Sequence, residues 1–525
     1  MRRIITLILF AIVGSLSLLA ATIITIDNPE EWTYTELKPY VGQTIQFATP
    51  MYITNNYGSS LTISPRRIYS PTNQAYPLSQ EYNDMLTADA WATISLSGVS
   101  GYHRIGEVML NLTVKVTSQN KVSFQSCTWS GNTRADLEDG YDQEAVCMHG
   151  EPNLIVCTMN LEYYLVESFG TGYGPDNYSD HQKQRAKVSK ALATINADVY
   201  GFVEIQQGQG ALAELAADLT KNTGRNFSYI NDGGSVYGSY TKAGFVYCTD
   251  KVQPYGKLRE NNTGVKNRKK TQAFQEISTG EKFLLSVNHF KAKSGSGSGD
   301  NADQGDGQGK FNGDRVREAQ SVIENYKKDR TFYGDSDILI MGDLNAYAME
   351  DPITLLREND MIDLHRAFHA DSSYSYVYRG QLGYLDHALC NSTLYPQVTG
   401  MIAYHINSDE SDNYTYDKSN DNSMFRCSDH DPIIVGLKLD STATAIPEIT
   451  IPEIHIYYDN SRPYIRNAEK GYYIVYRLDG QVVAQSSIES NDQMIDDLQQ
   501  GLYIINVYGK GTCLQSKVII YSVRG

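Results

Sequence analysis

The sequence has few cysteines, few tryptophans and a deficit of basic side chains. Its 525 residues include 7 cysteines and 3 tryptophans, and no Cys-x-x-Cys pair occurs. Cysteine and histidine are also absent at zinc-site spacing, which argues against a structural zinc ion. Lysine and arginine total 45 against 61 acidic residues, a net charge of −16 at pH 7. This balance argues against general affinity for nucleic acid unless a local basic patch offsets it, and Lys266–Lys270 is either such a patch or a solvated loop.

Long apolar runs are missing except near the start of the chain. Two arginines precede the stretch Ile4–Leu19, and the pair Ala20–Ala21 follows it. This order is typical of a secretory signal peptide, so we expect residues 1–21 to be removed and the protein to be secreted or attached to the cell surface. A retained membrane anchor is the alternative, and no later segment is apolar enough to span a bilayer. Export permits disulfides, and Cys127 and Cys147 could close one loop.

Four short segments set polar side chains against apolar runs that are typical of buried strands. Ionised groups at strand ends inside a core are costly unless they are paired or bound to metal. Four such segments therefore predict one convergent site. Hard oxygen ligands and histidines are the groups that metal-assisted phosphoester hydrolysis requires. The segments are Ser286–Phe290, Ile340–Asn345, Tyr384–His387 and Cys427–Pro432.

These segments resemble the motifs of a known enzyme group. Gly342-Asp-Leu-Asn345 and Ser428-Asp-His430, with an Asn-His-Phe and a Tyr-Leu-Asp-His between and around them, resemble the endonuclease/exonuclease/phosphatase superfamily, which includes DNase I and the abasic-site endonucleases. The resemblance implies an α/β (α+β) fold, a DNase I-like two-sheet sandwich flanked by helices. It also implies a divalent cation, Mg²⁺ or Mn²⁺, and in-line attack of water on phosphorus without a covalent intermediate.

The resemblance assigns catalytic roles to residues of these motifs. His289 and His430 are the proton-transfer candidates, because an unperturbed histidine titrates near ~6.5. Asp386 is expected to accept a hydrogen bond from one of these two rings, and the sequence leaves open which. Asp343 and Asn345 are two positions apart, so on an extended chain they project the same way. Both would bind the scissile phosphate and its metal, or orient the attacking water.

Three further residues match the metal side of the family's site. Asn160 ends an expected strand, and Asp429 precedes the histidine of the Ser-Asp-His motif. Glu204 lies near the end of another expected strand, where alternation would place it on one face with Tyr200 and Phe202, half-buried. The resemblance implies that Asn160, Glu204 and Asp429 bind the cation.

Two longer segments favour one branch of the superfamily. Asp303–Gly309, which reads DQGDGQG, and Gly342–Pro352 resemble large extracellular bacterial nucleases. The predicted function is therefore a secreted metal-dependent nuclease of extracellular DNA, with RNA as a second substrate. Arg315 is expected to contact phosphate or to lie at the surface. Calcium could also bind at three aspartates whose spacing is not that of an EF-hand, Asp300, Asp303 and Asp306.

The flanking regions have a different composition from the catalytic part, which is expected at 152–440. Residues 22–151 resemble an OB-like β domain, which could hold single strands or act as a spacer. A linker is expected at 441–452. Residues 453–525 resemble a C-terminal sorting domain of type IX secretion cargo, which would make the secretion machinery a partner, or a β-sandwich that caps the chain.

Two other functions remain open from the sequence. The first is a phosphatase or a phospholipase C-type phosphodiesterase of the same superfamily. The catalytic motifs alone do not separate these from a nuclease. The second is a non-catalytic surface-binding protein, which the intact set of catalytic residues disfavours.

Overall fold

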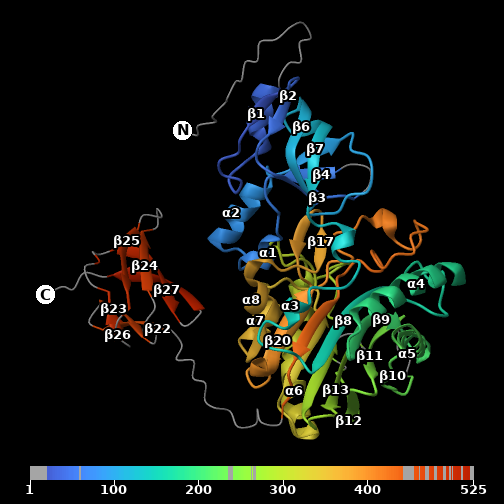
Figure 1. The fold of residues 1–525 in the computed structure, drawn as a ribbon. Helices are drawn as coiled ribbons and strands as arrows, with labels where there is room; N and C mark the ends of the chain where they lie inside the picture. The colour runs from blue at the N-terminus through green and yellow to red at the C-terminus, as the bar shows by residue number, and fades with distance from the viewer. Residues whose placement is uncertain are drawn as a thin grey trace. The chain divides into compact units, whose positions relative to one another are not determined.

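The computed structural model divides the chain into two compact units, residues 1–441 and 442–525 (Figure 1). Most of the expected signal peptide, residues 1–20, and all of the expected linker, 441–452, lie outside the described residues. The structure describes residues 21–57, 61–234, 240–261, 263, 268–440, 455–459, 462–466, 472–477, 482–488, 492–495, 498, 501–509 and 512–520.

The first part of unit 1 is a small β domain. Five strands pair in the closed order β6-β3-β4-β5-β7-β6, and β5 and β7 run parallel. Alternate apolar residues such as Ile45, Phe47, Ile53 and Val114 fill the interior and are fully buried or nearly so. Its elements are β1 (Thr22–Ile24), η1 (Tyr34–Tyr40), β2 (Thr44–Phe47), β3 (Met51–Asn55), β4 (Leu61–Ser64), α1 (Pro71–Gln74), α2 (Gln80–Asp89), β5 (Ile94–Ser97), β6 (Val108–Ser118) and β7 (Lys121–Ser130).

Two six-stranded sheets form the centre of the second part. The first has the order β10-β11-β9-β8-β21-β20, and the second has the order β12-β13-β14-β15-β19-β16. Apolar residues of both sheets share one buried cluster, which shows that the sheets pack face to face. The strands are β8 (Leu154–Tyr164), β9 (Val199–Gln206), β10 (Phe227–Tyr229), β11 (Thr241–Cys248), β12 (Val252–Glu260), β13 (Lys269–Glu276), β14 (Lys282–Asn288), β15 (Ile338–Asp343), β16 (Met361–Asp363), β19 (Asp386–Asn391), β20 (Val398–Ala403) and β21 (Ile433–Leu437).

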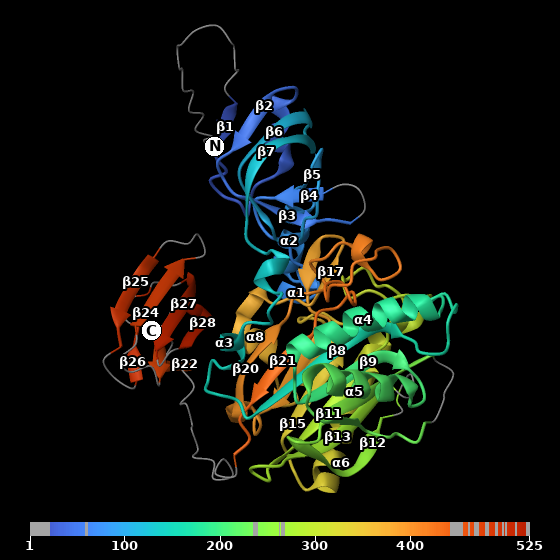
Figure 2. The ribbon, with the colours of Figure 1, turned by 45° about the vertical axis from the view of Figure 1, so that its right-hand side comes forward.

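Helices cover the outer faces of both sheets (Figures 1 and 2). Residues of α4 and α5 pack on the first sheet, and residues of α6 and α7 pack on the second. The predicted fold class, a two-sheet α/β sandwich flanked by helices, is confirmed. The helices and 3₁₀ turns are η2 (Arg134–Asp136), α3 (Gln143–Val146), α4 (Tyr178–Ile195), α5 (Gly210–Thr223), η3 (Gly299–Asn301), α6 (Asn312–Tyr333), α7 (Asp351–Arg357), α8 (Leu364–His369), η4 (Ala370–Ser372), η5 (Tyr395–Gln397) and η6 (Asp412–Tyr414).

Local sequence explains where α4 begins and ends. The side chain of Asn177 accepts a hydrogen bond from the backbone N–H of Asp180 at 3.1 Å, an N-cap that satisfies a free donor of the first turn. Val188, Leu192 and Ile195 recur at helical spacing and are buried against the first sheet. Asn196 then takes a left-handed conformation with φ 50°, which ends the helix.

Strand direction brings the predicted motifs to one edge of the sandwich. β8 and β9 run parallel, as do β14 and β15. β19 is antiparallel to β15, and β21 is antiparallel to β8. The last residues of β8, β9, β14 and β15 therefore lie at the same edge as the first residues of β19 and β21. This edge carries the candidate site.

Unit 2 is a separate β structure with its own core, in which Ile465, Val475, Ile505 and Val507 are buried. Its strands form a three-stranded and a four-stranded sheet. They are β22 (His455–Asp459), β23 (Arg462–Arg466), β24 (Tyr472–Arg477), β25 (Val482–Ser487), β26 (Asp492–Met494), β27 (Gly501–Gly509) and β28 (Thr512–Ile520).

The structure bears on two further expectations, a disulfide between Cys127 and Cys147 and the presence of membrane-spanning segments. Cys127 and Cys147 are free thiols, so the suggested disulfide loop is not formed, and Cys147 Sγ instead lies 3.7 Å from a carboxylate oxygen of Glu151. Within the described part of the chain, none of the helices combines the length and the apolar character needed to cross a bilayer.

Candidate active site

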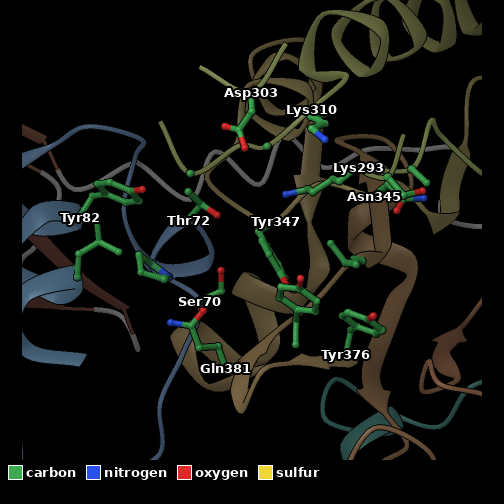
Figure 3. Close-up of a pocket in the computed structure, with 18 residues that line it drawn as sticks. Ser70, Thr72, Tyr82, Lys293, Asp303, Lys310, Asn345, Tyr347, Tyr376 and Gln381 are labelled. Carbon is green, nitrogen blue, oxygen red and sulfur yellow. The ribbon is translucent and has the colours of Figure 1, made fainter. Parts of the chain in front are cut away.

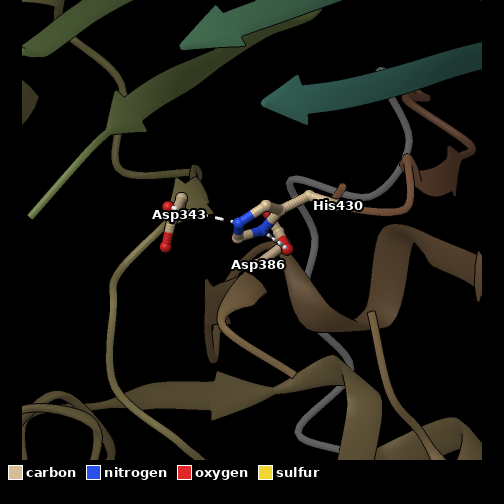
Figure 4. Close-up of side chains that lie close together, drawn as sticks. All are labelled: Asp343, Asp386 and His430. Atoms are coloured by element: carbon tan, nitrogen blue, oxygen red, sulfur yellow. Dashed lines mark hydrogen bonds and ion pairs between the residues drawn. The ribbon is translucent and has the colours of Figure 1, made fainter. Parts of the chain in front are cut away.

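The segments that carry His289 and His430 meet at the shared edge of the sheets. Figure 4 shows His430 paired with Asp386. Nδ1 of His430 lies 2.7 Å from Oδ2 of Asp386, and Ser375 Oγ donates to the same carboxylate oxygen at 2.7 Å. The histidine that Asp386 orients is therefore His430, which the sequence had left open. Because Nδ1 is engaged, Nε2 of His430 faces the site, 4.0 Å from Asp343 and 3.9 Å from Asp429. This pairing fixes the ring and stabilises its protonated form.

Asp343 links the other motifs. Its Oδ2 accepts hydrogen bonds from the side-chain amides of Asn160 and Asn345, both at 3.2 Å. The backbone N–H of Asn345 donates to Oδ1 at 2.8 Å. The expected extended chain between Asp343 and Asn345 is wrong, because β15 ends at Asp343 and Asn345 has a left-handed backbone with φ 50°. The two side chains meet because the chain turns back.

Gly342, which precedes Asp343, has a specific steric role. Its φ is 121°, and a Cβ at this position would lie 2.2 Å from the carbonyl oxygen of Asn288. Only glycine permits β15 to approach the end of β14 this closely. The glycine of the Gly-Asp-Leu-Asn motif thereby brings Asp343 next to His289.

His289 completes the histidine pair and lies near the same oxygen of Asp343 as His430. Its Nε2 lies 3.6 Å from Asp343 Oδ2 and 3.6 Å from Glu204 Oε1. Burial, with the charge of nearby Arg268, lowers the pKa of His289 well below its usual range. For His430 burial acts in the same direction, but the charges of Asp386, Asp429 and Asp343 together outweigh it and raise the pKa well above its usual range. The two imidazoles therefore carry different protonation states near neutral pH.

Glu204 reaches the site by a departure from strand alternation. Tyr200 and Phe202 point to the helix-covered core and Val203 to the core between the sheets, as alternation requires. Glu204 has φ 58°, and Ile205 then joins the helix-covered core although alternation would place it between the sheets. The expected shared face with Tyr200 and Phe202 is therefore wrong: the left-handed residue turns Glu204 toward His289.

Sequence reasoning missed Glu162, a carboxylate two residues beyond Asn160. Glu162 and Tyr163 have left-handed backbones, and the pairing of β8 with β9 is interrupted at this point. The backbone N–H of Tyr163 donates to Glu204 at 3.2 Å, which ties the two bulged strands together. Burial and the charge of Asp429 raise the pKa of Glu162 to about 8. The expectation that Asn160 ends its strand is wrong, because β8 continues to Tyr164. An acidic residue two positions after Asn160 was the available signal.

Tyr376 was also missed, because it lies outside every recognised motif. It begins the hairpin of β17 (Tyr376–Tyr378) and β18 (Gln381–Gly383). Its ring lies 4.6 Å, centroid to centroid, from the imidazole of His430. The hairpin therefore forms a wall of the site beside the His430 ring.

Comparison with known proteins agrees with this arrangement. The model of the endonuclease/exonuclease/phosphatase family matches residues 166–430, about half of the chain. The chain belongs to this family. It is a hydrolase of the superfamily that acts on phosphodiesters or phosphate esters. Asn160 and Glu162 lie just before the matched range, and His430 is its last residue.

Solved structures with a similar fold have little sequence identity to the chain. The human Nocturnin catalytic domain with bound sulfate is 12% identical and covers 55% of this chain and 94% of its own, with a TM-score of 0.38. A mannosyl-6-phosphatase of Bacteroides thetaiotaomicron is 16% identical over 54% of this chain and 99% of its own, TM-score 0.36. TDP2 of D. rerio complexed with a single-strand DNA product is 13% identical over 54% and 97%, TM-score 0.34. No curated protein matches the chain.

The donor set fits a divalent cation, as expected for the family. Asp343, Asp386 and His430 each offer a ligand atom, all within 4.8 Å of one another. Asp386 and His430, however, are hydrogen-bonded to each other, so of these three residues Asp343 is the one available to bind a cation. Burial and the charge of Asp429 raise the pKa of Glu204 to about 7, and burial raises that of Asp343 to about 7. Carboxylates crowded in this way are stabilised in the ionised form by a bound cation.

A cavity of about 380 Å³ collects these groups at the edge of the sandwich. The family's cation would be held here by carboxylate and amide oxygens. The residues that would hold it are Asn160, Glu162, Glu204, Asp343 and Asp429.

The expected basic patch is not formed by the lysines that the structure describes. Lys269 and Lys270 are buried, and each is paired with an acid: Lys269 with Glu318 at 2.8 Å and Lys270 with Asp232. Their side chains point into the protein because both lie on β13, a central strand of the second sheet. Lys266 and Asn267 lie outside the described residues.

Arg315 and the three aspartates of the glycine-rich loop, residues 293–309, have structural roles. Arg315 is fully buried, and its guanidinium donates to the carbonyl oxygens of Gln308 and Lys310 at 2.8 and 2.7 Å. It holds the loop onto α6 and is neither a phosphate contact nor a surface residue. Among the described residues the three aspartates form no group that could hold calcium. They are engaged locally: Asp300 pairs with Arg317, and Asp303 and Asp306 accept backbone N–H groups two residues on.

Proposed function

We propose that this protein is a secreted, metal-dependent nuclease that hydrolyses phosphodiester bonds of extracellular DNA, with RNA as a second substrate. The observation that carries the proposal is the oriented pair of His430 and Asp386 facing a cluster of buried carboxylates around Asp343. The segments that resemble large extracellular nucleases, Asp303–Gly309 and Gly342–Pro352, favour a polynucleotide over a small phosphate ester.

The chain's own residues divide the work of hydrolysis. The protonated Nε2 of His430, which Asp386 stabilises, is placed to donate a proton to the leaving oxygen. His289, kept neutral by burial, lies 3.6 Å from Asp343 and is the second proton-transfer group. The amide of Asn345 positions the phosphate and stabilises its added charge. When bound, Mg²⁺ or Mn²⁺ supplies the Lewis acid that neutralises charge on the phosphoryl oxygens.

The test is incubation of the full chain with supercoiled plasmid in Mg²⁺ or Mn²⁺, with EDTA as the metal-free arm. Nicked and then fragmented DNA, abolished by EDTA and by His430→Ala or His289→Ala, is the expected result. His149→Ala is the matched control, because this histidine is exposed and lies away from the cavity. Intact plasmid together with phosphate release from a phosphomonoester or a phospholipid would replace the nuclease by the phosphatase or phospholipase alternative.

We also propose roles for the flanking parts. The five-strand ring with one parallel pair supports an OB-like domain for residues 22–151, since OB-folds are small five-stranded barrels. Export by an N-terminal signal and a type IX sorting role for 453–525 remain proposals that rest on resemblance. Expression with and without 453–525, followed by an activity assay of cells and medium, tests the sorting role. Equal export of both forms would reject it.

A further inference from the structure

A second cavity opens beside the catalytic one and is bounded by both parts of unit 1 (Figure 3). Its volume is about 610 Å³, within the range of about 300–1,000 Å³ typical of small-molecule sites. The N-terminal β domain contributes residues of α1 and α2, and the catalytic part contributes the glycine-rich loop and the β17–β18 hairpin. In Figure 3, Tyr82 of α2 and the catalytic Asn345 stand on opposite sides of the cavity.

The N-terminal wall is held in place by buried contacts. Thr72 Oγ1 donates to the buried carboxylate of Glu350 at 2.9 Å. The backbone N–H of Ser70 donates to the carbonyl oxygen of Leu382 at 2.8 Å. Arg104, fully buried, pairs with Glu410 at 3.0 Å. These contacts fix the N-terminal β domain against the catalytic part, so the wall of the cavity has a defined position within unit 1.

This cavity adjoins the catalytic centre. Asn345 and Ala292 line both the 610 Å³ cavity and the catalytic cavity. On the other side of the hairpin, a third cavity of about 450 Å³ includes Glu162 and Asp429. Tyr376 and Tyr378 line both flanking cavities. The catalytic centre thus has open space on two sides, as a substrate that continues past the scissile bond requires.

The chemistry of the 610 Å³ cavity favours an uncharged ring over a second phosphate. Leu86 and Tyr378 lie at its wall with 44% and 50% of their surface exposed. Lys293 is neutralised by Glu350, whose carboxylate lies 2.5 Å from its Nζ. The other two charged side chains of the lining, Asp303 and Lys310, have opposite signs, so the cavity offers no net positive charge to an anion. A flat apolar group that covers Leu86 and Tyr378 is the complementary ligand.

We propose that this cavity binds the nucleobase next to the scissile phosphate, and that the N-terminal β domain thereby completes the substrate site. The proposal rests on the proposed nuclease function. The five N-terminal lining residues lie outside the range matched by the family model. They are Ser70, Pro71, Thr72, Tyr82 and Leu86.

The test compares kcat/KM on short single-stranded oligonucleotides that carry either a normal nucleotide or an abasic residue on one side of the cleaved bond. Stacking contributes about 1–3 kcal/mol per base, so Tyr378→Ala should lower kcat/KM about 5- to 150-fold on the normal substrate. The same change should leave the abasic substrate unaffected, and Tyr378→Phe should retain the wild-type ratio. Leu86→Ala should give a smaller base-dependent loss, and Glu81→Ala, on the exposed side of α2, should give none.

The outcomes separate this inference from the function on which it rests. Equal losses on the normal and abasic substrates, or wild-type rates that do not depend on the base, would overturn the subsite and leave the nuclease intact. Absence of cleavage by the wild-type protein with every metal would overturn the nuclease function and the subsite together.

Discussion

The Asp386 carboxylate lies against the imidazole of His430, with 2.7 Å between Oδ2 and Nδ1. The two residues lie 44 positions apart in sequence and belong to segments of different sheets. Asp386 opens β19 of the second sheet, and His430 comes three residues before β21 of the first. The pair therefore exists only when the sandwich has closed, so the candidate site depends on the packing of both sheets.

Replacing Asp386 by asparagine should disable His430 without removing it. The amide cannot stabilise the protonated ring, so we expect kcat for DNA hydrolysis to fall about 10²–10⁴-fold with little change in KM. Steady-state kinetics on a defined oligonucleotide measure this. Ser375→Ala, which removes only the second hydrogen bond to Asp386, should cost less. Unchanged kcat in Asp386→Asn would show that the pair has no part in turnover.

Replacing Glu162 by glutamine should reduce the stabilisation of the folded protein by Mg²⁺. Wild-type protein at a Mg²⁺ concentration 100 times Kd should gain about 2.7 kcal/mol and several degrees in Tm. Glu162→Gln should lose most of this gain, because a cation ligand is gone. In EDTA the variant should be at least as stable as wild type, since carboxylate crowding is relieved. Calorimetry with and without Mg²⁺ is the measurement, with exposed Glu81→Gln as control; a wild-type metal response in Glu162→Gln would exclude it as a ligand.

The buried ion pairs between the two parts of unit 1 should carry substantial stability. Glu410 accepts a hydrogen bond from Arg134 at 2.6 Å and forms an ion pair with Arg104 at 3.0 Å, and its side chain is fully buried. Glu410→Gln leaves charged guanidinium groups without a full counter-charge, so we expect a loss of about 3–5 kcal/mol. Urea unfolding measures it. Arg317→Gln breaks an exposed pair with Asp300 and should cost about 0–1 kcal/mol. Comparable losses in the two variants would contradict the burial argument.

Asp232 should make the free energy of unfolding depend on pH below about pH 4. Burial alone would raise its pKa, but Lys270 and Lys242 bring it down to about 2, below the ordinary 3.8. A depressed carboxyl pKa contributes stability above pH 4, and this contribution is lost as the pH falls toward 2. Asp232→Asn should therefore be about 2–4 kcal/mol less stable at pH 7, with the difference shrinking between pH 4 and 2.

Urea unfolding at pH 7, 5 and 3 follows the difference between wild type and Asp232→Asn. The control is Asp371→Asn, whose side chain is 60% exposed and pairs with Arg366. A difference that stays constant down to pH 3 would show that the lysines do not hold Asp232 ionised.

Sequence by itself determined the family, the fold class and the strands that carry the motifs. The reason is local. Buried apolar runs such as Ile433–Leu437 define strands, and ionised residues at the ends of such strands are costly unless they are paired or bound to metal. It also brought His289, Asp343 and His430 into one hypothesis, since each lies in a recognisable segment.

Tertiary structure decided how those residues act. Strand alternation would have turned Glu204 away, and only the left-handed bulge of β9 directs it to His289. The basic run suggested either a basic patch or a solvated loop, yet Lys269 lies inside because Glu318 of α6 packs over it. Contacts of this kind join residues far apart in the chain, and no local pattern encodes them. The same holds for the cavity beside Tyr378, which exists only because the N-terminal β domain packs against the catalytic sandwich.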